Sequence, residues 1–294
     1  MAEPVFHRLT LIGLGLIGSS VARAARARGV AGEIVAYDAS EPVRARVIEL
    51  GIADRVEAEV AQAVSGADCV MLCVPVGVLA DVTAAIAPHL APGAILTDVG
   101  STKLSVIRDM GPLVPEGVHF VPAHPLAGTE FSGPDAGFAS LFEGRYCLVV
   151  PPAGTDAQAV ARIRALWEGF GATVEEMEPA HHDRVLAMVS HLPHLIAFTI
   201  CGTADDLADE TRQEVLRFAA SGFRDFTRIA ASDPVMWRDV FLNNREALLE
   251  MLARFTEDAQ AMARAIRWGD AAYIEDRVLR GRKIRRSLIE IKQA

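Results

Sequence analysis

A glycine-rich turn between an apolar run and an alanine-rich segment places the strongest constraint on the fold of this chain. The apolar run RLTLI leads into the turn Gly13-Leu14-Gly15-Leu16-Ile17-Gly18, and SSVARAARAR follows it. A strand that passes through such a turn into a helix is typical of a nucleotide-binding α/β sheet. Gly13 permits the tight turn, Gly15 admits a pyrophosphate and Gly18 lets the helix approach the strand. The alternative is the same turn without a ligand. We expect five residues to contact a dinucleotide: Gly13, Gly15, Leu16, Ile17 and Gly18.

Apolar runs that alternate with helical segments extend this pattern as far as residue 177. After the first strand the runs are EIVAYD, DCVMLCV, AILTDV, VHFVPA and YCLVVP. Such strands, separated by helices, are typical of a parallel sheet covered on both faces. From residue 178 the strand pattern stops, and segments such as ETRQEVLRFAA have the period of helices. The sequence predicts an α/β fold with a Rossmann-type doubly wound sheet domain at 1–177, followed by an all-helical domain at 178–294.

Charge and composition argue against several classes of partner. The formal net charge is −9 over 294 residues, which disfavours nucleic acid and an anionic membrane surface. The first residues lack the features of a signal peptide, and no apolar stretch approaches the ~20 residues of a membrane span. The four cysteines have neither CxxC nor zinc spacing. We therefore interpret them as buried thiols of a cytoplasmic protein.

Asp38 ends the second predicted strand, twenty residues after Gly18. A carboxylate at this place accepts hydrogen bonds from the adenine ribose and repels a 2′-phosphate, so NAD is favoured over NADP. Capping of the next helix is the alternative role for Asp38. Val74 and Pro75 follow a later strand; Pro75 stops the ladder there, and the turn should border the cofactor.

Hydroxyl groups and a histidine follow the later strands. The segment DVGSTK ends one of them, so Gly100 and Ser101 should lie at the same sheet edge as the glycine turn. His124 precedes Pro125, which holds it in an extended backbone just beyond another strand. A histidine at that place is suited to meet the nicotinamide; the alternative is a loop histidine without a function.

Two further patterns lie in the helical half. The segment SHLPH interrupts a helix, and His191 and His194 share a helix face. They line a substrate pocket, form a metal pair that lacks a third ligand, or pack as core histidines; the pocket is favoured and no metal is expected. Further along, Asp225 can pair with Arg228, which would make a receptor for a substrate carboxylate. A solvated charged face is the alternative there.

The ordered motifs of this chain resemble the prephenate/arogenate dehydrogenase family over nearly its whole length. They are GLGLIGSS, CVPV, DVGSTK, HPLAGTE, SHLPH and GFRDFTRIAASDPVMWRD. The glycine motif is shared by many dehydrogenases, whereas HPLAGTE, SHLPH and DFTRIA in this order are specific. The resemblance implies NAD-dependent oxidative decarboxylation of prephenate to 4-hydroxyphenylpyruvate, or of arogenate to tyrosine, in tyrosine biosynthesis. It also implies a Rossmann domain and a helical dimerisation domain with the site between them.

The resemblance also assigns roles to residues. It implies that His124 hydrogen-bonds the ring hydroxyl of the substrate, that Ser101 assists it and that Arg228 binds a substrate carboxylate. Three pocket residues are implied, Thr129, Glu130 and His194, together with Trp237, which would reach into the partner's site. Near them, Asp135 is either a solvated turn residue or an acidic group that favours arogenate.

Two other functions stay open. A β-hydroxyacid or imine-type reductase has the same two-domain plan, but such enzymes commonly use a lysine where this chain has SHLPH. A non-catalytic NAD-binding module would keep the glycine turn without needing Ser101, His124 and Arg228 together. A homodimer built by the helical half is expected, because the amphipathic stretch from Pro234 to Ile266 has more apolar surface than one domain needs.

Overall fold

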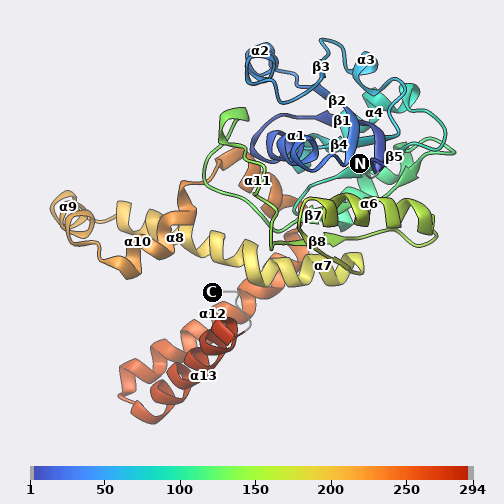
Figure 1. Cartoon of the computed structure of the whole chain (residues 1–294). Helices are drawn as coiled ribbons and strands as arrows, with labels where there is room; N and C mark the ends of the chain where they lie inside the picture. The colour runs from blue at the N-terminus through green and yellow to red at the C-terminus, as the bar shows by residue number, and fades with distance from the viewer. Residues whose placement is uncertain (1–2, 291–294) are drawn as a thin grey trace. The chain divides into compact units, whose positions relative to one another are not determined.

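A six-stranded parallel sheet forms the first part of the computed structural model, which describes residues 3–290 (Figure 1). The strand order is β3-β2-β1-β4-β5-β6, and every pairing in it is parallel. The strands are β1 (Phe6–Ile12), β2 (Ala31–Tyr37), β3 (Arg55–Val56), β4 (Cys69–Leu72), β5 (Ile95–Asp98) and β6 (His119–Phe120). The predicted parallel sheet is confirmed, although the two-residue β3 is too short to give a sequence pattern.

Helices cover both faces of this sheet. Along β4, Cys69 and Met71 pack into one apolar cluster, whereas the alternate residues Val70 and Leu72 pack into another. The first cluster includes side chains of α1 (Leu16–Arg28) and α6 (Ala157–Gly169). The second includes side chains of α3 (Val60–Val64), α4 (Leu79–Ile86) and α5 (Leu104–Met110). Because successive side chains of a strand point to opposite faces, both faces of β4 are buried, as its continuous apolar run predicts.

A second, three-stranded sheet was not expected from the sequence. It consists of β7 (Ala123–Pro125), β8 (Tyr146–Val149) and β9 (Thr173–Glu176). β7 pairs with β8 antiparallel and β8 pairs with β9 parallel. The run VHFVPA, predicted as one strand, is divided between β6 and β7 around Pro122, which has no N–H to continue the ladder. The division removes His124 from the main sheet.

The chain is helical from Pro179 onward, as predicted. α7 (Pro179–Leu186) passes through a π-helical turn (Ala187–His191) into α8 (Leu192–Asp205), which together form one long helical run (yellow in Figure 1). The remaining helices are α9 (Asp209–Phe218), α10 (Ser221–Thr227), α11 (Pro234–Asn243), α12 (Arg245–Trp268) and α13 (Ala271–Glu290). By contacts the chain forms two compact units, one ending at Arg245 and one beginning at Glu246. This division falls inside the predicted helical domain.

The stretch Pro179–Asp205 is long and apolar enough, by length and composition, to cross a membrane. The expectation from the sequence that no apolar stretch approaches this length is wrong. It also holds the buried polar side chains of His182, Asp183 and His191. Asp183 accepts a hydrogen bond from the backbone of Lys103, which follows β5. The N-terminal part of the stretch is thereby tied to the sheet domain, and 28% of its most apolar window is buried inside the structure.

Candidate active site

The glycine turn leaves open the space that a dinucleotide needs. Gly13 has a φ of +92°, and a Cβ there would lie 2.7 Å from the carbonyl oxygen of Cys73. A Cβ on Gly18 would lie 2.0 Å from the carbonyl oxygen of Gly13, whereas one on Gly15 would meet nothing within 4 Å. Among the described residues no side chain caps α1, so the N-terminal end of the helix faces this space. The turn therefore fits a pyrophosphate.

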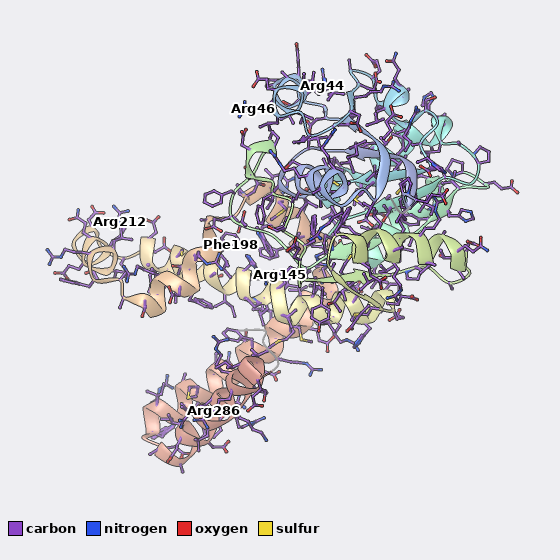
Figure 2. All side chains as sticks on the ribbon, viewed as in Figure 1. Arg44, Arg46, Arg145, Phe198, Arg212 and Arg286 are labelled. Atoms are coloured by element: carbon purple, nitrogen blue, oxygen red, sulfur yellow. The ribbon has the colours of Figure 1, made fainter. Side chains whose placement is uncertain are left out.

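Asp38 is fixed beside the turn by two backbone donors. Its Oδ2 accepts from the N–H of Leu14 at 2.8 Å, and its Oδ1 accepts from the N–H of Ser40 at 2.9 Å. Arg44 of α2 (Glu41–Leu50; Figure 2) donates to the backbone carbonyl of Asp38 at 2.7 Å. The carboxylate thus lies at the end of β2, where an adenine ribose would contact it.

The other predicted cofactor residues border the same edge. A Cβ on Gly13 would lie 2.8 Å from Cγ1 of Val74, so Val74 packs against the glycine turn. Pro75 follows it and precedes a 3₁₀ turn at Val76–Val78. The N–H of Gly100 donates to Oδ2 of Asp98 at 2.7 Å, which holds the turn after β5.

His124 lies at the end of a buried chain of hydrogen bonds. Its Nδ1 is 3.0 Å from Nε2 of His182, and the two rings meet edge to face. Nδ1 of His182 is in turn 2.8 Å from Oδ1 of Asp183. All three side chains are buried.

Asp183 also anchors the turn that carries Ser101. Its Oδ1 accepts from the backbone N–H of Lys103 at 2.7 Å, and its Oδ2 accepts from the N–H of Leu104 at 3.0 Å. The Lys103 Nζ, which is fully buried, forms an ion pair with Oδ2 of Asp98 at 2.6 Å. The Ser101 turn is therefore fixed both to the sheet and to α7.

The electrostatic environment keeps His124 neutral. Burial lowers its pKa well below the usual histidine range, and the neighbouring His182, Lys103 and His191 lower it further. A neutral imidazole has one free lone pair, so it accepts a proton in the way a general base requires.

His191 presents a hydrogen-bond donor to the same region. Nδ2 of Asn244 lies 2.9 Å from Nδ1 of His191 and 2.8 Å from the backbone carbonyl of Asp183. The amide is a donor, so Nδ1 of His191 accepts and Nε2 carries the proton. That buried Nε2 has no partner among residues 3–290. Burial lowers the pKa of His191 to about 4, although the negative charge of Asp183 opposes the shift.

His194, Trp237, Arg228 and Glu130 form a second group. The rings of His194 and Trp237 are stacked, with centroids 3.6 Å apart. Burial lowers the pKa of His194, and the charge of Arg228 lowers it further. Nη1 of Arg228 lies 3.5 Å from Oε2 of Glu130, so in the described part of the chain its ion pair is with Glu130 and not with Asp225. The ring contact of Trp237 with His194 lies within one chain, whereas the resemblance implied a reach into the partner's site.

Thr129 and Asp135 both follow β7 but differ in their surroundings. The Thr129 hydroxyl accepts from the N–H of Phe131 at 3.3 Å, which stabilises the loop beyond β7. Asp135 pairs with Arg46 of α2 (Figure 2) at 2.6 Å, and its side chain is exposed. The carboxylate of Asp135 is therefore directed to α2, and its position does not support the hypothesis of an arogenate-selecting group.

The sequence interpretation missed four residues of this network: Lys103, His182, Asp183 and Asn244. Adjacent His and Asp residues near the start of an amphipathic helix have no distinctive spacing. The one available signal was that His182 and Asp183 fall on the apolar side of a helix, where a buried polar side chain needs partners.

Two family models match the chain. One, for the nucleotide-binding domain of prephenate dehydrogenase, matches residues 21–176; the other, for its dimerization domain, matches residues 178–278. The chain belongs to the prephenate dehydrogenase family. It is accordingly an oxidoreductase of the prephenate/arogenate dehydrogenase type, and NAD is its cofactor. The motif resemblance and the predicted cofactor are thereby confirmed.

Individual relatives agree. A cyclohexadienyl dehydrogenase of Zymomonas mobilis is 43% identical over 284 residues, 97% of each chain. The crystal structure of prephenate dehydrogenase from A. aeolicus in complex with hydroxyphenyl propionate and NAD⁺ is 32% identical, with a TM-score of 0.88, over 98% of this chain and 99% of that one. The arogenate dehydrogenase of Synechocystis is 25% identical with a TM-score of 0.80, over 95% and 99% of the two chains.

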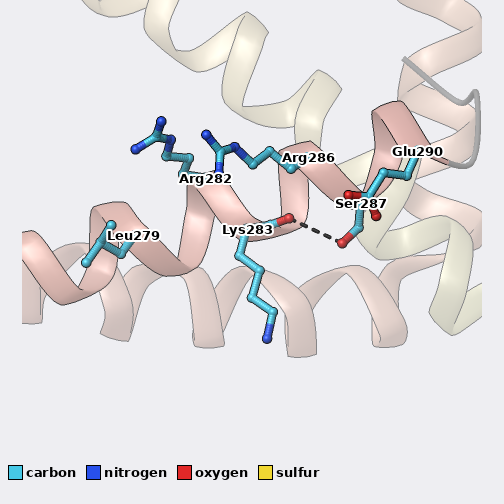
Figure 3. Close-up of a pocket in the computed structure, with 6 residues that line it drawn as sticks. All are labelled: Leu279, Arg282, Lys283, Arg286, Ser287 and Glu290. Atoms are coloured by element: carbon cyan, nitrogen blue, oxygen red, sulfur yellow. Dashed lines mark hydrogen bonds between the residues drawn. The ribbon is translucent and has the colours of Figure 1, made fainter.

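A shallow hollow on α13 lies apart from these residues in the sequence. Figure 3 shows its lining: Leu279, Arg282, Lys283, Arg286, Ser287 and Glu290. The Ser287 hydroxyl donates to the backbone carbonyl of Lys283 at 3.3 Å, as in an ordinary helix turn. None of the predicted site residues lies on α13.

Proposed function

We propose that this chain oxidises a cyclohexadienyl substrate, prephenate or arogenate, with His124 as the general base. The observation that carries the proposal is the buried His124, whose Nδ1 is hydrogen-bonded to His182 and whose pKa is lowered by burial. His124 stands next to Pro125, in the loop that leads on to Glu130. A neutral histidine in this environment is suited to take the proton of the ring hydroxyl.

The reaction joins three events in one substrate. NAD, held by the glycine turn and Asp38, would supply the acceptor for the hydride of the hydroxyl-bearing ring carbon. The ring carboxylate leaves as CO₂, its bonding electrons enter the ring, and the ring becomes aromatic. His124 takes the hydroxyl proton, while Ser101 assists in orienting the hydroxyl. Arg228, held opposite Glu130, binds a substrate carboxylate, with His194 and Trp237 lining the same pocket.

Glu130, Thr129 and His191 complete the proposed substrate site, and the cofactor site consists of the glycine turn with Asp38, Val74, Pro75 and Gly100. The segment from residue 178 supplies the substrate-binding and dimerisation part of a cytoplasmic homodimer. The assembly is carried over from the family's dimerization domain.

A direct assay tests the activity. Purified protein should reduce NAD in the presence of prephenate or arogenate, with release of CO₂ and of 4-hydroxyphenylpyruvate or tyrosine. His124→Asn should lower kcat by about 10²–10⁴-fold, the usual worth of a positioned base, with little change in KM. Near-normal turnover in folded His124→Asn protein would reject His124 as the base, and no NAD reduction with either substrate would reject the activity.

A further inference from the structure

The hydrogen-bond chain behind His124 determines which of its two ring nitrogens is free. The Asp183 carboxylate can only accept, so Nδ1 of His182 carries a proton at the 2.8 Å contact. A neutral His182 then has its lone pair on Nε2. That lone pair requires a proton on Nδ1 of His124, 3.0 Å away, and the lone pair of His124 is left on Nε2.

We propose that His182 and Asp183 are positioning residues that hold His124 in the tautomer with its proton on Nδ1 and its Nε2 free to accept the proton of the substrate hydroxyl. The inference deepens the proposed function and rests on His124 being the base. In the opposite tautomer Nε2 would carry a proton and could not accept one.

The proton moves to His124 and back. The O–H bond of the substrate breaks, the proton binds Nε2 of His124, and the bonding electrons form the carbonyl as the hydride leaves. When CO₂ is lost and its bonding electrons make the ring aromatic, the carbonyl π electrons return to the oxygen, which takes the proton back from Nε2 as a phenol. Between the two transfers His124 is an imidazolium that still donates through Nδ1 to His182. His182 keeps its own proton on the Asp183 side, so the carboxylate stabilises the positive charge without being protonated.

The surroundings hold Asp183 in one orientation. The backbone N–H groups of Lys103 and Leu104 each donate to one of its two oxygens. Asn244 donates to its backbone carbonyl at 2.8 Å, which joins α7 to the end of α11. With donors on both oxygens the carboxylate is fixed as an acceptor toward His182, and a fixed acceptor fixes the tautomer of the whole chain.

Substitutions of similar size separate this role from a packing role. His182→Gln retains an oxygen that accepts from His124, whereas His182→Leu has a similar volume and no acceptor. We expect His182→Leu to lower kcat by about 10²-fold or more, which is within the range that a general base supplies. His182→Gln should retain most of the wild-type kcat. KM and the affinity for NAD, measured by fluorescence titration, should stay close to wild type. His181→Leu, at the exposed preceding position, is the matched control and should behave as wild type.

The tautomer itself can be measured in the wild-type protein. In protein labelled with ¹⁵N-histidine, the His124 signals, assigned by difference with His124→Asn, should show a protonated Nδ1 and an unprotonated Nε2 at neutral pH. A protonated Nε2, or equal kcat losses in the Leu and Gln variants, would overturn the positioning role. If instead His124→Asn keeps its turnover, the base assignment fails first, so the two failures are distinguishable.

Discussion

At the scale of single residues, two histidines of the candidate site have different hydrogen-bond roles. His124 and His191 are both buried, with lowered pKa values, yet their partners differ. His182 leaves His124 with an accepting Nε2, whereas Asn244 leaves His191 with a donating Nε2. One ring thereby presents an acceptor and the other a donor, without a charge on either ring.

Arg228 should act on substrate binding more than on turnover. Its side chain is 61% exposed and its contact with Glu130 is 3.5 Å long, so a substrate carboxylate can replace this weak ion pair. We expect Arg228→Gln to raise KM by about 10–100-fold, because a hydrogen bond to a charged group is worth about 1.5–3 kcal/mol. Steady-state kinetics with varied substrate measure this. Arg224→Gln, at an exposed position one turn earlier, is the control; a collapse of kcat at unchanged KM would contradict the role.

Asp38 should determine the choice between NAD and NADP. Its carboxylate is fixed by Leu14 and Ser40, and the Arg44 guanidinium is bonded to a backbone carbonyl. A 2′-phosphate would therefore meet a fixed negative charge. We expect the wild type to have a higher kcat/KM with NAD than with NADP. Asp38→Ser should lower the ratio of these two kcat/KM values by about tenfold, or ~1.4 kcal/mol. Equal use of both cofactors by the wild type would refute this.

At the scale of elements, the sequence predicts strands that have a local apolar pattern. It does not predict strand pairings between segments that are far apart in the chain. The apolar runs before Gly13 and around Met71 correctly predict β1 and β4, because both faces of these strands are buried. The short β3 and the polar β9 gave no such run. The antiparallel pairing of His124 with Leu148 depends on contacts between distant segments, so the second sheet could not be read from either segment alone.

The same limit applies to the site. His124 and the SHLPH segment could be singled out as site candidates because a proline close to a histidine restricts the backbone. The π-helical turn at Ala187–His191 ends two residues before Pro193 and shows how the helix accommodates that proline. No local sequence pattern marks His182 and Asp183 as partners of His124. Their hydrogen bonds join them to residues after β5 and in β7, which are distant in the sequence.

The helical run from α7 to α8 should make stability depend on pH. Burial lowers the pKa values of His182, His191 and His194, that of His191 to about 4. Below pH 6.5 the unfolded chain binds protons at these groups while the folded protein does not. Proton binding therefore stabilises the unfolded state relative to the folded state. Stability is fully present above pH 6.5 and is lost as the pH falls toward 4.

For His191 alone the loss approaches about 3 kcal/mol near pH 4, at ~1.4 kcal/mol per pH unit. Urea unfolding should therefore show a free energy of unfolding that stays nearly constant from pH 7.5 to 6.5 and decreases from pH 6.5 to 5. His191→Asn should lower stability at pH 7.5 but reduce this slope, whereas His181→Asn, with its exposed side chain, should leave the slope unchanged. A free energy that is constant over this range would show that the histidines titrate normally.

At the scale of the whole molecule, the second compact unit has too much exposed apolar surface for a single chain in water. Trp268 is 81% exposed, and Ile266 and Ile284 are each 65% exposed. Exposed apolar groups of this size on adjacent helices indicate an interface. The family model that matches residues 178–278 is that of a dimerization domain.

We therefore expect a homodimer in which a second copy covers α12 and α13. Sedimentation at micromolar concentration should give a species near twice the 31.5 kDa chain mass. Ile266→Glu should weaken the dimer, because it introduces a charge into an apolar interface without a partner. Ile48→Glu, at the similarly exposed isoleucine of α2, is the matched control and should leave the mass unchanged. A wild-type protein that sediments as a stable, active monomer would refute the dimer, and the exposed residues of α12 and α13 would then require another partner.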